Sequence, residues 1–380
     1  MTHTPLARLR RLWLDVHLWL GVGLMVVLIP LSITGAILVW HDALDRSLYA
    51  SRYAVSGPEA SQPVTAYAAA ADKAFAGRAT LTQIRLPQKP GDPVVAVGRI
   101  KGPTGPDGRP RTLNVWIDPP TAGVLASAEI ARTFTMVTHR LHGSLLIPGT
   151  GRKVVGWLGW AMFVSSATGL WLWWPRHAGF TRGLRWRRGA STLFNLHHMI
   201  GFWLCLPLAV LSLTGVYISF PQTSHALLGA PPPPARPTGP GRFAPPIEHP
   251  TTSLEAAVAT ALAEKPNANL ASVNTPTRGK ETVWRVELDT PGAGEPVTVQ
   301  VTDATGLIKL GKRAGDAAGP RERGPDPLSR WVRRIHDGGE MGIVWRMVIT
   351  LAGTAPAMLG VSGLVMWLRR RARQRAMHHA

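Results

Sequence analysis

Two histidines lie inside stretches of sequence that are otherwise apolar enough for a lipid bilayer. The stretch "DVHLWLGVGLMVVLIPLSITGAIL" contains His17, and the stretch "NLHHMIGFWLCLPLAVLSLTGVYI" contains His197. When the two stretches are overlaid, these histidines coincide, and a Thr-Gly pair follows each of them at the same interval. An ionisable side chain is costly in a membrane helix, so it marks a functional site unless it reaches the interface or bonds a carbonyl.

A second pair of histidines repeats in the same way, just before two further apolar stretches. His142 in "HRLHGSLLIPG" corresponds to His336 in "RRIHDGGEMG", and Gly169 and Gly363 follow them at the same spacing. Similarity in the same order along a chain indicates an internal duplication. The sequence therefore predicts two repeats, each made of a span, an outer loop, a short histidine-bearing helix and a second span.

Paired imidazoles on repeated helices can supply both axial ligands of a haem iron. Repeats that run in the same direction are related by a pseudo-two-fold axis along the membrane normal, which brings equivalent residues to the same depth. Histidine is a standard haem ligand, and helix bundles commonly hold cofactors between facing helices. We predict one haem between His17 and His197 near the cytoplasmic end and a second between His142 and His336 at the outer end.

The inner site has two neighbouring candidates for one ligand. His198 is adjacent to His197, and successive helical residues point about 100° apart, so both cannot ligate one iron equally well. The repeat favours His197, because Leu occupies the position that corresponds to His198, and leaves His198 for a propionate or a quinone headgroup. Glycines near the ligands would let a macrocycle approach the backbone; they are Gly21, Gly201 and Gly143.

Cationic and imidazole side chains beside the outer pair are further candidates. His139 stands one helical turn before His142, but the repeat places an arginine at the corresponding position, so His139 is the weaker ligand candidate. Arg140 and Arg334 could bind haem propionates or could equally anchor the helices at the membrane interface. Zinc is not expected, since no Cys or Glu joins these histidines to complete four ligands.

The elements that must position these residues are four apolar segments, each long enough to cross a bilayer with about 20 residues of helix. They are residues 13–40, 154–175, 193–220 and 343–368. The short segments 1–12, 176–192 and 369–380 contain many arginines and no Asp or Glu. By the positive-inside rule these three segments are predicted to be cytoplasmic, which explains much of the net charge of +20 without a nucleic-acid partner.

The two long loops, 41–153 and 221–342, are then predicted to face the periplasm if the source is a bacterium. Each contains a helix-forming segment, "VTAYAAAADKAFA" or "SLEAAVATALAEK", followed by strand-like segments and the short histidine-bearing helix. Each final hairpin turns on an Asp followed by Thr and Gly, at Asp118 and at Asp303. The predicted fold is an α-helical membrane protein with four transmembrane helices in two parallel repeats and two small α+β modules, joined by a proline-rich connector at 231–246.

Taken together, the motifs "RLHG" and "NLHH", the Thr-Gly pairs and the paired Asp-Thr-Gly turns resemble the PepSY-associated transmembrane family. Within that family the sequence resembles ferric-siderophore reductases of the ferrioxamine-reductase type. The resemblance covers nearly the whole chain and implies a bacterial inner-membrane protein that holds two b-type haems. It also implies reduction of a ferric siderophore in the periplasm with release of Fe(II). The electron donor is left open between a quinol and a cytoplasmic reductase, because the sequence has no Rossmann glycine motif.

Two other functions are compatible with the same helices. A non-redox membrane anchor or sensor would use the outer modules to bind a peptide or a peptidase. A transporter would use the histidines as proton carriers, although no Asp or Glu lies deep in the apolar segments. Purified protein with a haem absorption spectrum would favour the oxidoreductase over both alternatives.

Overall fold

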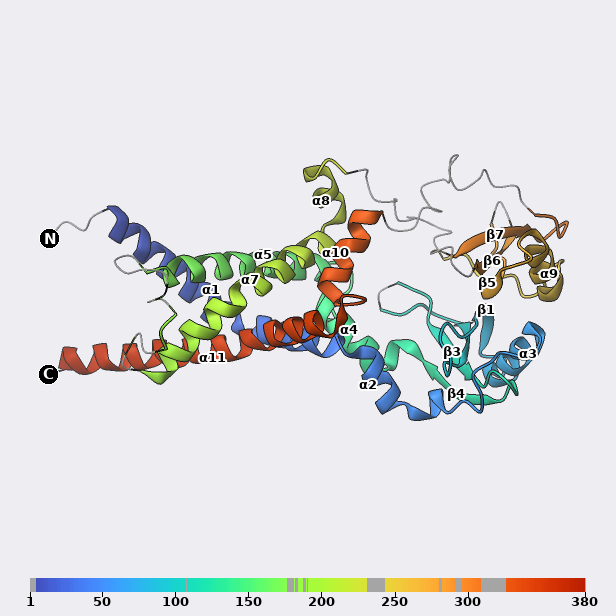
Figure 1. Cartoon of the computed structure of the whole chain (residues 1–380), viewed down its shortest axis with the longest axis horizontal. Helices are drawn as coiled ribbons and strands as arrows, with labels where there is room; N and C mark the ends of the chain where they lie inside the picture. The colour runs from blue at the N-terminus through green and yellow to red at the C-terminus, as the bar shows by residue number, and fades with distance from the viewer. Residues whose placement is uncertain are drawn as a thin grey trace. The chain divides into compact units, whose positions relative to one another are not determined.

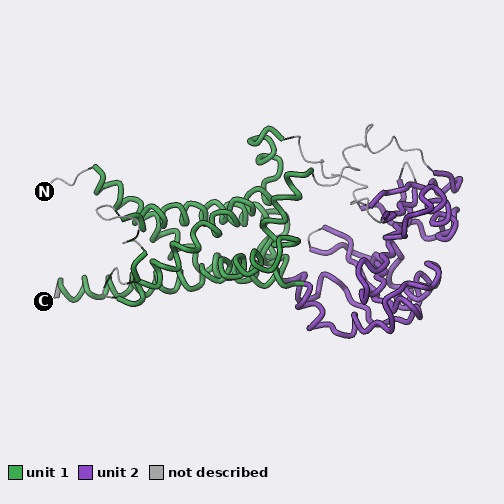
Figure 2. The backbone as a smooth tube through the Cα atoms, viewed as in Figure 1, with its two compact units in different colours: residues 1–41, 138–233, 324–380 green, residues 42–137, 234–323 purple. Residues whose placement is uncertain are grey.

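The computed structural model divides the chain into two compact units (Figure 2). One unit contains residues 1–41, 138–233 and 324–380, and the other contains residues 42–137 and 234–323. The structure describes residues 5–106, 108–175, 181, 184–186, 189, 191–230, 243–279, 282–290, 296–308 and 326–379. Part of the basic segment 176–192 lies outside the described residues, including its arginines at 176, 182, 187 and 188. Most of the proline-rich connector lies outside them as well.

Four long helices form the first unit, and all four are long and apolar enough to cross a membrane. They are α1 (Pro5–Leu38), α5 (Gly151–Trp173), α7 (Thr192–Ser219) and α11 (Gly342–His379). Helix α1 packs against α11 and α5, and α7 packs against α5 and α11, so the helices close into a bundle (Figure 1). The four predicted spans are confirmed, although α1 and α11 continue farther toward the chain termini than the predicted segments.

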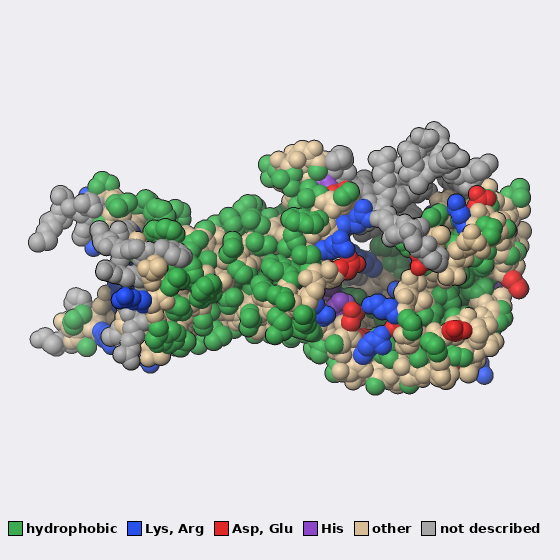
Figure 3. Space-filling model, viewed as in Figure 1, with side chains coloured by type: hydrophobic (Ala, Val, Ile, Leu, Met, Phe, Trp, Pro, Cys, Tyr) green, Lys and Arg blue, Asp and Glu red, His purple; other side chains and the backbone are tan. Residues whose placement is uncertain are grey.

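The surface of the bundle is segregated as a bilayer requires. Apolar side chains cover the length of the bundle, and Lys and Arg side chains lie toward its two ends, one of which holds both chain termini (Figure 3). Several of the largest apolar side chains are exposed, among them Trp157, Trp203 and Leu206. Such a broad exposed apolar surface would be unfavourable in water, so it supports a lipid environment.

Shorter helices flank the ends of the spans. They are α2 (His41–Leu48), α4 (Phe134–Ser144), α8 (Pro221–Leu227) and α10 (Pro327–Asp337). Helix α10 packs against α7 and begins at a defined cap, where the Asp326 carboxylate accepts a hydrogen bond from the Ser329 N–H at 3.0 Å. It ends at Gly338, whose φ of 74° is the left-handed conformation that favours glycine after a helix.

The second unit is built on a single seven-stranded sheet with the order β4-β3-β2-β1-β5-β6-β7. The strands are β1 (Ala79–Arg85), β2 (Val94–Ile100), β3 (Thr112–Ile117), β4 (Val124–Glu129), β5 (Asn269–Asn274), β6 (Val283–Asp289) and β7 (Val297–Thr302). The sequence predicted two small modules, but β1 of the first pairs antiparallel with β5 of the second, and Ile84 lies opposite Val273. This pairing satisfies two strand edges that would otherwise expose unpaired backbone groups.

One hydrophobic core serves both halves of this sheet. Helices α3 (Val64–Phe75) and α9 (Leu254–Glu264) pack on the same face of the sheet, where Phe75, Ile84 and Val286 are fully buried (Figure 1). Strand β6 shows how the sequence pattern selects this face. Trp284, Val286 and Leu288 are buried, whereas Arg285 and Glu287, which alternate with them, are not.

The predicted Asp turns contribute more than a local bend. Asp118 accepts a hydrogen bond from the Ser56 N–H at 2.7 Å, and Asp303 accepts one from the Thr252 N–H at 3.1 Å. In each half the carboxylate thus fixes the segment that precedes the module's helix. The indole of Trp284 also donates to Asp303, at 3.3 Å.

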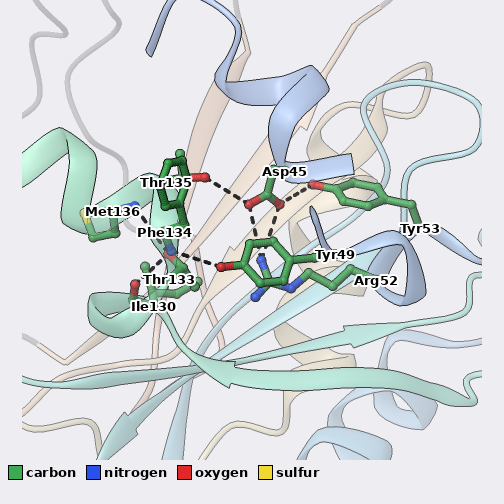
Figure 4. Close-up of polar contacts among 9 residues, drawn as sticks. All are labelled: Asp45, Tyr49, Arg52, Tyr53, Ile130, Thr133, Phe134, Thr135 and Met136. Carbon is green, nitrogen blue, oxygen red and sulfur yellow. Dashed lines mark hydrogen bonds and ion pairs between the residues drawn. The ribbon is translucent and has the colours of Figure 1, made fainter. Parts of the chain in front are cut away.

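A buried arginine organises the start of α4. The Arg52 guanidinium is almost fully buried, lies 3.6 Å from the centre of the Tyr49 ring and pairs with the Asp45 carboxylate at 3.3 Å (Figure 4). Tyr49 in turn accepts a hydrogen bond from the Phe134 N–H at 2.9 Å, and the Thr135 hydroxyl donates to Asp45 (Figure 4). The first turn of α4 therefore has partners for groups that a helix N-terminus leaves unsatisfied.

Candidate functional site

The first histidine pair is assembled by α1 and α7. The rings of His17 and His197 face each other with their centroids 6.4 Å apart and their planes at 89°. The second pair is assembled by the short helices α4 and α10, where the rings of His142 and His336 have centroids 6.1 Å apart and planes at 40°. The structure thus brings together the residues that the sequence overlay had matched, pair by pair.

Both separations fit a single metal ion held between two imidazoles. Metal–imidazole bonds are about 2.0–2.1 Å long and the ring centre lies about 1 Å behind the nitrogen, so two axial rings place their centroids roughly 6 Å apart. Edge-to-face ring pairs have centroid distances in the same range, so the spacing fits a shared metal ion without requiring one. Among the described residues no three His, Cys, Asp or Glu side chains gather as a metal site, so each pair offers two protein ligands and no more.

The inner histidines have their proton on Nδ1. His17 Nδ1 lies 3.1 Å from the Ser165 carbonyl oxygen, which can only accept, so Nδ1 must donate. His197 Nδ1 lies 2.8 Å from the Ser362 hydroxyl, and that hydroxyl itself donates to the Leu359 carbonyl. In both rings Nε2 is therefore the nitrogen with a free lone pair for a metal.

The outer histidines are fixed by the same logic. His142 Nδ1 donates to the Leu31 carbonyl at 2.8 Å. His336 Nδ1 lies 2.9 Å from the Thr214 hydroxyl, which donates to the Val210 carbonyl and so accepts from the ring. A carbonyl, directly or through one hydroxyl, thus sets the tautomer of all four rings, as outer partners do in metal sites.

Burial keeps the outer rings neutral. It lowers the pKa of His142 to about 4, with a further contribution from the neighbouring His336. Burial likewise lowers the pKa of His336 to about 4. Both rings are therefore unprotonated on Nε2 at neutral pH, which is the form that binds a metal.

A glycine lies against each of the four rings and explains residues that the sequence comparison only aligned. A Cβ at Gly35 would meet His142 Cε1 at 2.8 Å, and one at Gly169 would meet His17 Cε1 at 3.1 Å. Gly215 and Gly363 stand in the same relation to His336 and His197, at 3.2 and 3.6 Å. Each ring thus packs directly on the backbone of a neighbouring spanning helix.

The closest of these contacts gives a sharp test. In Gly35→Ala the new methyl group must displace the His142 ring, so we expect weaker haem binding at the outer site and a change in its low-spin electron paramagnetic resonance signal. Overpacking of this kind typically costs about 1–3 kcal/mol of stability. Gly23→Ala in the same helix is the matched control, because a Cβ at Gly23 meets nothing within 4 Å. An unchanged spectrum in Gly35→Ala would contradict the assigned ligand.

The glycines singled out from the sequence have a different environment. A Cβ at Gly21 or Gly143 would meet no protein atom within 4 Å, and one at Gly201 would only touch Leu359 at 4.0 Å. The backbone at these positions is therefore not packed against a protein neighbour. This is compatible with the predicted approach of a macrocycle.

Of the two adjacent histidines of α7, His197 is the one that faces His17. The His198 ring stacks between Phe194, at 5.3 Å between centroids, and Trp173, at 6.0 Å. It thus belongs to an aromatic stack at the inner end of the bundle. The helical offset of one residue explains why the two rings serve different surroundings.

The remaining candidates are not brought into the histidine pairs. His139 is exposed, Arg140 is half-buried, and the exposed Arg334 is paired with Glu340. His41 is exposed and its Nδ1 donates to the Leu38 carbonyl at 2.9 Å. His225 is buried, with its Nε2 2.7 Å from the Tyr217 hydroxyl, so it cannot touch a substrate in solvent.

Two tryptophans of the sheet unit, Trp116 and Trp284, could by sequence either stack on a chelate or fill a small core, and the structure places both in the protein interior. Trp284 is 2% exposed and lies in the core of the sheet unit. Trp116 is 6% exposed, and the Arg52 guanidinium lies over its ring, 4.1 Å from the ring centre. Of the two roles that the sequence left open, these residues therefore take the structural one.

Four membrane-length helices, with one facing histidine pair on α1 and α7 and another on the short helices α4 and α10, define a class of membrane protein with two candidate cofactor sites. In this chain they are joined to a one-sheet α+β unit. Residues 14–370 match the family described as the PepSY-associated TM region. The chain therefore belongs to the PepSY-associated transmembrane family, as its motifs predicted. No curated protein matches the sequence.

Proposed function

We propose that this protein is a dihaem oxidoreductase of the bacterial inner membrane that passes electrons outward to a ferric siderophore in the periplasm. His17 and His197 would hold one b-type haem, and His142 and His336 would hold the other. In this proposal both termini lie in the cytoplasm and the sheet unit lies in the periplasm, in line with the arginine distribution. Each histidine pair would take one residue from each of two duplicated halves of the chain.

One observation supports this proposal above the others. Two separate histidine pairs have the centroid spacing of axial ligands, and every one of the four rings has its Nδ1 committed to a hydrogen bond. These hydrogen bonds leave Nε2 of all four rings as the nitrogen available to a metal, which helix packing alone does not require.

The chain's own residues would fix position, tautomer and burial. A bis-imidazole haem supplies one-electron transfer, and one-electron reduction of ferric iron weakens its binding to hard oxygen ligands, which releases Fe(II). The carbonyls of Leu31 and Ser165 hold the rings in the required orientation. The surrounding helices exclude water and so set the electrostatic environment of each site.

The colour of the purified protein tests the proposal directly. Protein produced with ample haem should contain two haems per chain, with a sharp Soret band and the α-band of a reduced b-type haem. Under anaerobic conditions the reduced protein should be reoxidised by ferric siderophores. Colourless protein would favour a non-redox anchor or sensor that binds a peptide or a peptidase.

A further inference from the structure

Among the described residues, helices α3 and α9 cover one face of the sheet of the second unit, and on the other face strands β1, β5, β6 and β7 carry polar side chains. Strand register places residues that oppose each other on the same face. One row crosses six neighbouring strands through Asn114, Val97, Gln83, Asn274, Arg285 and Gln300. The adjacent row passes through Trp116, Val95, Arg85, Ser272, Glu287 and Thr298.

The centre of this face is accessible and positively charged. Arg85 and Arg285 are exposed, and Gln83 and Asn274 are partly exposed between them. The carboxylate of Glu287 already accepts a hydrogen bond from the Ser272 hydroxyl at 2.7 Å. Within the described part of the chain, the 3₁₀ helices η1 (Ala50–Tyr53) and η2 (Ile130–Arg132) pack at the β3 and β4 end of the sheet.

The two central arginines differ from Arg99 of β2 and from Arg111, which directly precedes β3. Among the described residues neither the Arg85 nor the Arg285 guanidinium makes an ion pair or a side-chain hydrogen bond. By contrast, Arg111 of the same sheet is paired with Glu129 at 2.7 Å, and Arg99 donates to the Phe243 carbonyl at 2.7 Å. Two exposed guanidinium groups on one polar face without acidic partners provide a site for an anionic ligand.

The spacing of these groups fits a small ligand rather than a polymer. Arg85 lies on β1 and Arg285 on β6, two strands away, with an offset of two residues along the strand direction. Ideal sheet dimensions then place their Cα atoms ~12 Å apart. Guanidinium groups bind carboxylates through two parallel hydrogen bonds, and side-chain amides donate to carbonyl and hydroxyl oxygens. A chelate surrounded by carboxylate and carbonyl oxygens could contact both arginines and the amides between them.

We infer that the part of this face centred on Arg85 and Arg285 binds the ferric chelate and selects chelates that carry negative charge. This inference rests on the proposed function and adds the chemical class of its substrate. A cationic chelate, such as the amine-bearing trihydroxamate that the ferrioxamine-type resemblance implies, would meet two uncompensated guanidinium groups on this face. The inference therefore departs from that resemblance in the charge of the substrate. The selectivity therefore follows from charge rather than from the shape of a pocket.

Binding can be measured without any redox step by using gallium(III) citrate, an anionic complex that the haems cannot reduce. Calorimetric titration of the full chain in nanodiscs should show binding that Arg85→Gln and Arg285→Gln each weaken by ~10-fold, since charge-assisted hydrogen bonds are the stronger class. Lys73→Gln on α3 is the matched control, because it removes the same charge from the helix-covered side and should bind as the unmodified protein does. The gallium(III) complex of an amine-bearing trihydroxamate, which is cationic, should bind more weakly and be indifferent to both arginine substitutions.

Unchanged gallium citrate binding in both arginine variants would overturn the inference, and so would an equal loss of that binding in Lys73→Gln. It would also be overturned if the protein bound anionic phosphatidylglycerol vesicles and gallium citrate did not displace them. Thermal melting checks that the variants fold, as expected for two exposed side chains. The outcome is separable from the proposed function. Haem-containing protein that reduces ferric citrate at rates independent of both arginines rejects this docking face alone, whereas colourless protein that binds gallium citrate through them rejects the redox function alone.

Discussion

His142→Ala and His336→Ala are each expected to leave one haem per chain and to abolish reoxidation of the reduced protein by ferric siderophores. Either substitution removes one of the two imidazoles whose centroids are 6.1 Å apart. Loss of an outer hydrogen-bond partner alone typically costs 10–100-fold in metal affinity or activity, so loss of the ligand itself should reduce the reoxidation rate by at least ~100-fold. Haem content by pyridine haemochrome and stopped-flow reoxidation measure the two effects.

His139→Ala is the control for this experiment, because His139 lies on the same helix one turn earlier and is exposed. It should keep two haems and a nearly unchanged rate. Retention of both haems in His142→Ala and in His336→Ala would show that the outer pair does not ligate iron. Loss of a haem in His139→Ala would move the ligand to that residue.

His197→Ala is expected to remove the inner haem, and His198→Ala to retain it. The reason is that the His197 ring faces His17 at 6.4 Å, whereas the His198 ring stacks on Phe194 and Trp173. The same loss is expected for His17→Ala. Haem content should fall from two per chain to one in these variants and remain two in His198→Ala.

The inner variants should also separate the two ends of the electron path. Protein lacking the inner haem should no longer accept electrons from a donor at the cytoplasmic side. When dithionite reduces the outer haem directly, ferric siderophore should still reoxidise it. A His197→Ala protein that keeps both haems, or loses reoxidation after dithionite reduction, would contradict the assignment of inner and outer roles.

Local features of the sequence were enough to predict the spans and the partners within each histidine pair. Apolar length sets whether a helix can cross a bilayer, and this depends only on composition along a short segment. The predicted duplication supplied the long-range information, because an axis along the membrane normal places equivalent residues at the same depth and brings them together when they lie near that axis. The turns at Asp118 and Asp303 were also predictable, because each closes locally: the Ala122 N–H donates to the Asp118 carbonyl, and the Gly306 N–H donates to the Thr302 carbonyl.

Other features depend on contacts that no local pattern encodes. The helical period alone allows either His197 or His198 to face His17 of α1, and only the repeat favoured His197. The rotation of α7 within the bundle decides between them. Likewise, the sequence could not show that Gly35 lies under the ring of His142, since the two residues belong to different helices. The joining of two expected modules into one sheet was missed, because edge strands have the same alternation whether or not they find a partner.

The sequence by itself determined the class of membrane protein, its four spans and the residues able to ligate a metal, because hydropathy, charge placement and repetition are properties of the chain. Tertiary structure alone decided the tautomer of each ring, the glycine beneath it and the sheet face on which Arg85 and Arg285 lie together. These depend on which carbonyl, backbone or strand edge approaches from a distant part of the chain.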